Sequence, residues 1–398
     1  MKGIAFDLGT TTIVAYLCDL DAGRIEKSTS CPNEQIKYGL DVLSRVSFQS
    51  ASYENAQKLS DALGDQICRM YDEISSGQDA PKKALFVGNP VIMGSILHYD
   101  FAKKGIDAIR IPGIGHYVGA DALAGAMLAE KDRNGKNILL IDIGTNTEII
   151  LLSDKAKTAT SAAAGPAMEG GNLKCGMRGE EGAIEFVKLT ETVSTNSDIV
   201  FKVIGDTAPR GICGSGYFSL LKLLIDKGVI DNNGYLLSKK EALQANVPAR
   251  LAGRIHESND RDNTENKDRY FSLTESIMLS QEDIRNLQLA IAAIRTGVEI
   301  VISEAKLTDA VIDNIYLAGA FGNKITIDSL IALNMLPKSM NDRIVQVGNI
   351  AGIGACSLLM DSDKITNAIN LKKDILTVSL ADHVDFQRIF FEKMNFAQ

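Results

Sequence analysis

The sequence predicts a duplicated α/β fold, with two related halves and a cleft between them. The first observation is a repeat: "GIAFDLGTTTIVAYL", residues 3–17, returns as "NILLIDIGTNTEIILL", residues 137–152. The second is that a similar order of strands and helices follows each copy, over a period much longer than that of solenoid repeats. At 398 residues, the chain is long enough for two or three domains with buried cores.

The first half begins with a hairpin around the repeated turn. Short apolar runs predict its strands, and apolar residues at helical spacing predict its helices. A strand ended by Asn-Pro and a small-residue helix complete this half. The expected elements are strands over 3–7, 12–19, 24–30 and 83–90, and helices over 41–50, 56–75, 92–98 and 118–131.

The second half repeats the hairpin and then departs from the first by a long glycine-rich insertion. The expected elements are strands over 138–142, 148–152, 156–163 and 343–348, a strand leading into "LAGAFGN", helices from Ser215, over 281–306 and over 351–360, and an exposed charged loop over 250–268. We therefore place one half at 1–130 and the other at 131–365, with insertions at about 165–280. We expect the last segment, 366–398, to pack back on the first half.

The composition excludes several classes of protein. With 45% hydrophobic and 23% charged residues, the chain resembles an ordinary soluble protein. A net charge of −8 argues against a general nucleic-acid binder, which needs a basic face. No leader opens the chain and no uncharged apolar run reaches the ~18 residues of a membrane helix, so we expect a cytoplasmic protein without a membrane partner. The six cysteines form no CxxC pair and the four histidines lack metal-ligand spacing.

The repeated turn has the chemistry of a phosphate site. Its glycine allows a tight bend, successive N–H groups form a concave anion site, and threonine hydroxyls add donors. Asp7 and Asp142 would repel phosphate unless a cation stands between, and hydrated Mg²⁺ suits one or two carboxylates. One such turn is often a plain strand connection, but two in matching positions predict the two walls of a nucleoside triphosphate site. The chain has no GxxxxGK[ST] P-loop.

These motifs resemble a known superfamily. "FDLGTTT", "IDIGTNTE" and "LAGAFG" resemble the two phosphate motifs and the adenosine motif of the acetate kinase, sugar kinase, Hsp70 and actin proteins. "GPAMEGGNLKCGM", "GICGSG", "SQEDIRNLQLAIAAIRTGVEI" and "IYLAGAFGNKITIDSLIALNMLP" are similar to the nucleotide-binding domain of reductive activators of corrinoid enzymes. The resemblance covers essentially the whole chain. It implies two ribonuclease H-like domains of the actin/Hsp70-like type with ATP between them.

The resemblance also implies a function. Such activators couple ATP hydrolysis to the reduction of an inactive Co(II) corrinoid to Co(I), so the expected cofactors are ATP and Mg²⁺ and the expected partner is a cobalamin-bound corrinoid protein. Many of them carry an iron–sulfur domain, and none is evident in this chain. We therefore expect electrons from a separate donor such as a ferredoxin-like protein. The family is compatible with a homodimer, which the sequence by itself does not indicate.

By the same resemblance, residues can be given roles. Asp7 and Asp142 would organise Mg²⁺, largely through water. Asp121 or Glu169 would orient the water that attacks the phosphate. The plainer alternatives are that Asp121 caps its helix and that Glu169 is a solvated carboxylate in a loop. The residues expected to line the nucleotide are Gly9, Thr10, Thr11, Thr12, Gly144, Thr145, Asn146, Gly170, Gly171, Gly214, Ser215, Gly319, Ala320, Phe321, Gly322 and Asn323. For Gly319, Ala320, Phe321 and Gly322, close packing of helix and strand is the alternative.

Three other functions remain open at this stage. A small-molecule kinase could use the same fold, with a bound hydroxyl or carboxylate in place of water. An activator of 2-hydroxyacyl-CoA dehydratases would hold an iron–sulfur cluster between two subunits, which the cysteine pattern argues against. An Hsp70-like binding module would need a substrate-binding β domain, and no such domain is recognisable. The favoured hypothesis is a clamp that ATP closes and hydrolysis opens by hinge motion.

Overall fold

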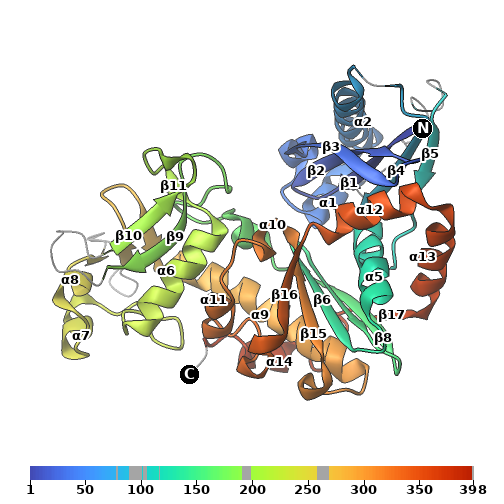
Figure 1. Ribbon diagram of the computed structural model, residues 1–398. Helices are drawn as coiled ribbons and strands as arrows, with labels where there is room; N and C mark the ends of the chain where they lie inside the picture. Colours follow the sequence, from blue (N-terminus) through green and yellow to red (C-terminus); the bar gives the residue numbers. More distant parts are fainter. Residues whose placement is uncertain are drawn as a thin grey trace.

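The computed structural model describes residues 1–77, 79–88, 101, 105–115, 117–190, 199–257 and 269–396. The helix expected over 92–98 lies outside these residues. Figure 1 shows three parts: a first half with its sheet at the upper right, a second half with its sheet below it, and a lobe at the left that is inserted into the second half.

The first half is built on one mixed sheet of order β3-β2-β1-β4-β5. An antiparallel hairpin and its third strand form one side, and two strands parallel to β1 form the other. The strands are β1 (Lys2–Leu8), β2 (Thr12–Asp19), β3 (Arg24–Pro32), β4 (Lys83–Gly88) and β5 (Asp107–Arg110). One face of this sheet is covered by η1 (Glu34–Tyr38), α1 (Val42–Ala51) and α2 (Tyr53–Ser75), around a core that includes Phe6, Leu63 and Phe86.

The second half repeats this topology. Its sheet has the order β16-β15-β6-β7-β8-β17, so the run from β16 to β8 matches the run from β5 to β3, and β17 is an added edge strand. The strands are β6 (Ile138–Ile143), β7 (Thr147–Leu152), β8 (Lys157–Ala162), β15 (Asn314–Ala318), β16 (Ile344–Gly348) and β17 (Ile375–Thr377). The internal duplication expected from the sequence is therefore confirmed at the level of strand order.

Two helices lie between the sheets, as Figure 1 shows. They are α5 (Ala120–Asp132) from the first half and α12 (Ile350–Met360) from the second, and their apolar side chains share one core with residues of both sheets. The two helices cross closely because they are rich in small residues. A Cβ at Gly354 would lie 2.3 Å from the carbonyl oxygen of Ala124, and one at Gly125 would lie 2.9 Å from Ile350 Cγ2.

The inserted lobe contains two small three-stranded sheets and several short helices. Its elements are η3 (Pro166–Glu169), β9 (Ala183–Leu189), β10 (Ile199–Val203), η4 (Ile204–Asp206), β11 (Gly211–Ile212), α6 (Gly214–Asp226), α7 (Lys239–Gln244), α8 (Ala249–Ala252), β12 (Ile255–Glu257), β13 (Arg269–Ser272) and β14 (Met278–Ser280). The expectation of an exposed loop over 250–268 is wrong for its first part. Leu251, Ala252 and Ile255 are buried there, and these apolar residues anchor α8 and β12 within a segment that is charged on average.

The remaining helices complete the second half. They are α9 (Gln281–Glu304), η5 (Asp309–Val311), α10 (Gly319–Gly322), α11 (Ile327–Ala332), η6 (Lys338–Arg343), α13 (Ser362–Asp374) and α14 (Phe386–Glu392). In the described part of the chain, α9 alone is long and apolar enough to cross a membrane, and 72% of its most apolar stretch is buried against protein, as in a core helix. Within the last segment, α13 contacts α5 and α12, whereas α14 packs on α9.

Candidate functional site

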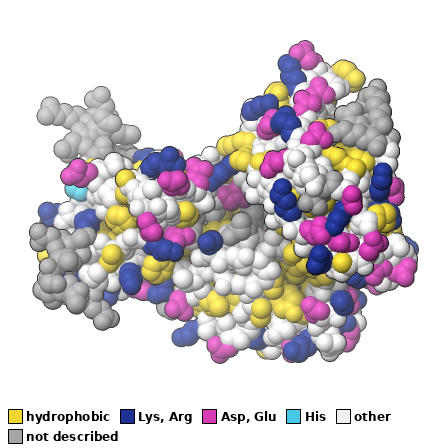
Figure 2. All heavy atoms as spheres, turned by 45° about the horizontal axis from the view of Figure 1, so that its top comes forward, with side chains coloured by type: hydrophobic (Ala, Val, Ile, Leu, Met, Phe, Trp, Pro, Cys, Tyr) yellow, Lys and Arg dark blue, Asp and Glu magenta, His cyan; other side chains and the backbone are white. Residues whose placement is uncertain are grey.

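The two copies of the repeated turn meet each other in space. The first turn, residues 9–11, joins β1 to β2, and the second turn, residues 144–146, joins β6 to β7. Thr11 Oγ1 and Thr145 Oγ1 lie 2.9 Å apart, although 134 residues separate them in the chain. Hydroxyls from opposite halves thus converge on one point. Figure 2 shows the surface hollowed between the first half and the inserted lobe.

Three aspartates gather beside these turns. Asp7 and Asp142 occupy the last but one position of β1 and β6, and Asp121 lies in the first turn of α5. Burial together with the charge of Asp121 raises the pKa of Asp7 to about 7, and burial together with the charges of Asp121 and Asp7 raises the pKa of Asp142 to about 7. Burial also raises the pKa of Asp121. The three carboxylates therefore repel one another in a poorly solvated place.

An amide from the other half contacts this cluster. Asn349 Nδ2 donates to Asp7 Oδ2 at 2.8 Å and to Tyr16 Oη at 3.1 Å. Its Oδ1 accepts from the Gly352 amide at 2.8 Å, which caps α12 and fixes the orientation of the side chain. Asn349 was not among the predicted site residues. A signal was present, because an asparagine directly before a small-residue helix is typical of an N-cap.

A fourth carboxylate near the turns, Glu148, was also not predicted. Glu148 on β7 lies directly opposite Asp142 on the antiparallel strand β6. Its Oε1 accepts a hydrogen bond from Ser161 Oγ at 3.3 Å. Burial and the charges of Asp121 and Asp142 raise the pKa of Glu148 well above its usual range. The residue lies two positions after the second turn, so its place in "GTNTE" was the available signal.

The two candidates for orienting water lie in different places. Glu169 ends η3, and its Oε1 accepts from Thr145 Oγ1 at 3.3 Å, which places it at the second turn. Asp121 belongs to the aspartate cluster, and its Oδ1 accepts from the Ala122 amide at 2.9 Å. Gly119, rather than Asp121, occupies the N-cap position of α5. Both carboxylates therefore lie near the turns, Glu169 on η3 and Asp121 on α5.

The glycines after Glu169 are required by close packing of the loop. Gly170 has a φ of 82°, and a Cβ there would lie 2.3 Å from the Met177 carbonyl oxygen. A Cβ at Gly171 would lie 2.6 Å from Pro166 Cβ. These contacts keep the loop that carries Glu169 tightly folded on itself. Contact of Gly170 and Gly171 with phosphate stays a prediction.

The segment expected to approach adenosine packs closely against the end of β6. Gly319 has a φ of 88°, and a Cβ there would lie 2.4 Å from the Ile143 carbonyl oxygen and 2.9 Å from Asp142 Oδ1. Phe321 is buried and packs edge-on against Phe218, with 5.0 Å between ring centroids, so its ring belongs to the core. The alternative of helix–strand packing thus has direct support for Phe321.

The neighbouring residues of this segment also make structural contacts. A Cβ at Gly322 would lie 3.2 Å from Leu317 Cγ, and Asn323 Oδ1 accepts from the Gly348 amide at 3.1 Å. Gly348 has a φ of 72° and directly precedes Asn349. The expected adenosine segment is therefore connected by one hydrogen bond to the residue before the cap of α12. The side chain of Ala320 lies outside what the structure describes.

Gly214 and Ser215 begin α6 beside η3. A Cβ at Gly214 would lie 1.8 Å from the Met168 carbonyl oxygen, so only glycine fits there. Ser215 Oγ donates to the Glu185 carbonyl at 3.0 Å and lies 3.4 Å from Cys213 Sγ. These contacts explain both residues by packing, and a role in binding phosphate stays a prediction.

The acidic cluster suits a hydrated cation. Within the described ranges, no group of three or more His, Cys, Asp or Glu side chains is close enough to hold a metal ion directly. Burial and the charge of Asp121 nevertheless raise the pKa values of both Asp7 and Asp142, and a nearby cation would offset this repulsion between carboxylates. Oxygen donors that reach a cation through water are what Mg²⁺ accepts. The residues present therefore fit the expected Mg²⁺.

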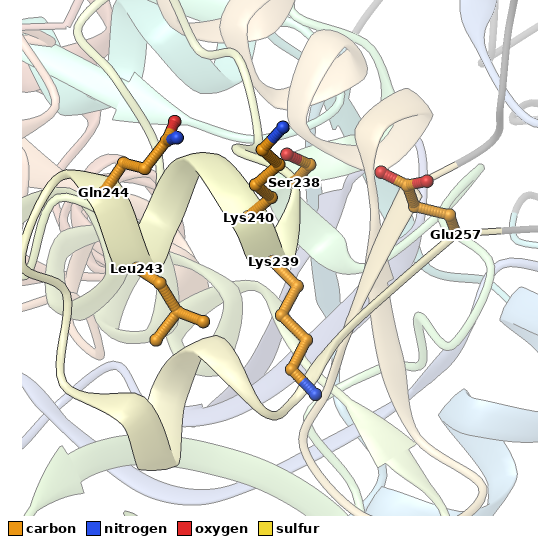
Figure 3. A pocket seen from close by; sticks show the side chains of 6 residues that line it. All are labelled: Ser238, Lys239, Lys240, Leu243, Gln244 and Glu257. Atoms are coloured by element: carbon orange, nitrogen blue, oxygen red, sulfur yellow. The ribbon is translucent and has the colours of Figure 1, made fainter.

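A separate hollow lies in the inserted lobe, with a volume of about 740 Å³. Figure 3 shows it along α7, and its lining residues are Ser238, Lys239, Lys240, Leu243, Gln244 and Glu257. It contains none of the residues predicted to bind nucleotide. The chemistry expected from the sequence belongs to the paired turns, and this hollow is a different feature.

Relatives of this chain are found by sequence. The corrinoid activation enzyme RamQ of Eubacterium limosum is 33% identical over 407 residues, covering 92% of this chain and 66% of that protein. The Co(II) methylated amine-specific corrinoid protein reductase of Methanosarcina barkeri is 24% identical over 439 residues, covering 96% of this chain and 74% of that protein. The chain thus spans about two thirds to three quarters of the length of these relatives.

Structure and family models agree with this result. A solved reductive activator for corrinoid, iron–sulfur protein superposes with a TM-score of 0.81 at 26% identity, covering 100% of this chain and 66% of that one. The family model of the RACo middle region matches residues 2–102, and the model of the C-terminal domain of RACo, the ASKHA domain, matches residues 136–398. The resemblance inferred from the motifs and the duplicated actin/Hsp70-like fold are both confirmed. The chain belongs to the RACo family.

Proposed function

We propose that this chain binds and hydrolyses ATP to promote the reduction of an inactive Co(II) corrinoid protein to its Co(I) form. The observation that carries the proposal is the meeting of the two turns, with Thr11 and Thr145 in contact and the aspartates beside them. The names of the relatives support the choice of a corrinoid protein as partner. The geometry supports a ligand with several phosphates held from both sides.

In this proposal, each wall of the cleft performs part of the binding. The amides and hydroxyls of both turns donate to phosphate oxygens. Asp7 and Asp142 hold the waters around Mg²⁺, which when bound neutralises part of the phosphate charge. Asp121 or Glu169 orients the attacking water. Glu169 contacts Thr145 and Asp121 belongs to the aspartate cluster, so the geometry does not favour one of them over the other.

The coupling to cobalt would depend on movement between the halves. Because α5 and α12 share a core with both sheets, closing the turns around ATP would move these helices, and a bound corrinoid protein would respond to that movement. Shifting a two-state partner from 1:99 to 99:1 needs about 10⁴-fold in equilibrium. For a one-electron step, in which tenfold is about 59 mV, this corresponds to ~240 mV. The electrons themselves would come from a separate iron–sulfur protein, or from another domain.

The test is an anaerobic assay with the Co(II) form of a corrinoid protein and a low-potential reductant. We expect the visible spectrum to change from Co(II) to Co(I) only with this chain, Mg²⁺ and ATP, and to stay unchanged with a non-hydrolysable ATP analogue. Asp7→Ala and Asp142→Ala should lose turnover of ATP. Unchanged turnover in both variants would refute the proposed site, and phosphorylation of a sugar or acid without any effect on cobalt would favour the kinase function.

A further inference from the structure

The three carbonyl groups of the first turn are all held from one side. Asn33 Nδ2 donates to the Gly9 carbonyl at 2.9 Å, and the Asn33 amide donates to the Thr11 carbonyl at 2.9 Å. Between them, Arg45 Nη2 donates to the Thr10 carbonyl at 2.6 Å. Two residues outside the predicted motifs therefore fix every peptide group of this turn.

The orientation of the carbonyls also decides where the amides point. In a trans peptide, the C=O and N–H groups point in opposite directions. When Thr10 directs its carbonyl at Arg45, the N–H of Thr11 points away from Arg45. In the part of the chain that the structure describes, no acceptor is found for the N–H groups of Thr10 and Thr11. The turn therefore presents unpaired donors on the side opposite Asn33 and Arg45, and the Thr11 hydroxyl of the same turn contacts Thr145.

Arg45 is an unusual residue to find in this place. Its side chain is only 1% exposed, and all its hydrogen-bond acceptors are neutral: the Thr10 carbonyl, the Gly39 carbonyl at 2.9 Å and Gln35 Oε1 at 3.4 Å. No carboxylate of the described ranges forms an ion pair with it, and Asp41 is the charge that acts on it from a distance. Burial lowers its pKa to about 10, so the guanidinium stays charged at neutral pH.

A buried cation with neutral partners is costly for the folded protein. The cost is partly offset when an anion binds nearby, because the attraction between the two is strong in a poorly solvated place. In the second turn, the matching carbonyl of Thr145 accepts from the backbone amide of Gly165 at 2.9 Å. Within the described ranges, the charge of Arg45 therefore lies behind the first turn, and a neutral backbone amide takes the same place behind the second.

We propose that Asn33 and Arg45 are positioning residues, which orient the first turn so that its amides face the phosphates, and that the charge of Arg45 makes the site favour the more highly charged nucleotide. This inference rests on the proposed function, since it concerns the same site. Neither residue touches the ligand in this proposal. Both act through the peptide groups of residues 9–11.

The experiment measures the binding of ATP, ADP and adenosine to the full chain by calorimetry, with Mg²⁺ present. Arg45→Met removes the charge at similar length. Because Arg45 acts through the peptide group of Thr10, the loss of affinity should stay within the roughly 10- to 100-fold that a hydrogen bond to a charged group contributes. We expect that loss for ATP, a smaller loss for ADP and no change for adenosine. Arg133→Met is the matched control, because Arg133 is also buried but pairs with Glu130 and Asp154 at the far end of α5.

A second variant serves if Arg45→Met does not fold. Asn33→Asp keeps the oxygen that accepts from the Gln35 amide at 3.0 Å but turns the donor to Gly9 into an acceptor. It should weaken ATP at least tenfold and leave adenosine unchanged. Equal losses for ATP and adenosine in either variant, or no loss for ATP, would overturn the inference. Failure of the wild-type chain to bind ATP would instead refute the proposed function, so the two failures are distinguishable.

Discussion

The carboxylate of Asp7 depends on an amide supplied from the far end of the sequence. Asn349 donates to it and, through the same side chain, begins α12. The hydrogen bond from Asn349 opposes the effects of burial and of Asp121 on the pKa of Asp7. A single side chain therefore connects the position of a helix to the state of a carboxylate in the candidate site.

Replacing Asn349 by Ser should weaken the site for Mg²⁺ while preserving the helix. Serine still caps α12, but it no longer donates to Asp7, and a hydrogen bond to a charged group corresponds to roughly tenfold or more in affinity. We expect the Mg²⁺ concentration for half-maximal ATP hydrolysis to rise about tenfold. Tyr16→Phe is the control, because it leaves the bond between Asn349 and Asp7 in place. A similar rise in both variants would contradict this explanation.

The raised pKa values of Asp7 and Asp142 predict how stability changes with pH. Their folded-state values of about 7 exceed the unfolded value of 3.8. Between those limits the folded chain binds more protons than the unfolded chain, so the free energy of unfolding falls as pH rises. Without Mg²⁺ and nucleotide, urea unfolding should show higher stability at pH 5 than at pH 8. The double variant Asp7→Asn, Asp142→Asn should show a smaller difference, and an equal difference would count against the cluster.

The crossing of α5 and α12 is the element-scale feature on which the shared core depends. Gly354 has no room for a side chain, because its Cβ would meet the backbone of Ala124. Gly354→Ala should therefore destabilise the chain by about 1–3 kcal/mol, measured by urea unfolding. Gly179→Ala is the matched control, since a Cβ there meets only Ile204 Cδ1 at 3.9 Å. A stability of Gly354→Ala equal to that of the control would show that the helices can separate freely.

The elements themselves were largely predictable, since local patterns determine them. The strand over 12–19 was predicted with its observed limits, and the helix predicted over 351–360 is observed as α12 with a start one residue earlier. Contacts between residues that are far apart in the sequence could not be predicted. Nothing local shows that Asn33 and Arg45 hold the first turn, or that Asn349 contacts Asp7. The burial of Phe321 against Phe218 was hidden for the same reason, because its partner lies about a hundred residues away in the sequence.

At the scale of the whole molecule, the two turns act as one site although each belongs to a different half. A ligand that bridges them should protect both at once. We expect a non-hydrolysable ATP analogue with Mg²⁺ to slow amide hydrogen exchange in residues 9–12 and 144–147 together. Asp142→Ala should abolish protection in both segments. Protection confined to one of them would mean that the nucleotide is held by a single wall.

The position of α12 has a consequence for how the chain can be divided. This helix is encoded late in the sequence, yet together with α5 it covers the sheet made by residues 2–110. Each half thus contributes a helix to the core that the two sheets share, so a cut between the halves leaves each fragment with an exposed apolar surface. The molecule is therefore suited to fragment complementation: we expect two pieces cut between the halves to aggregate when alone and to fold together on mixing.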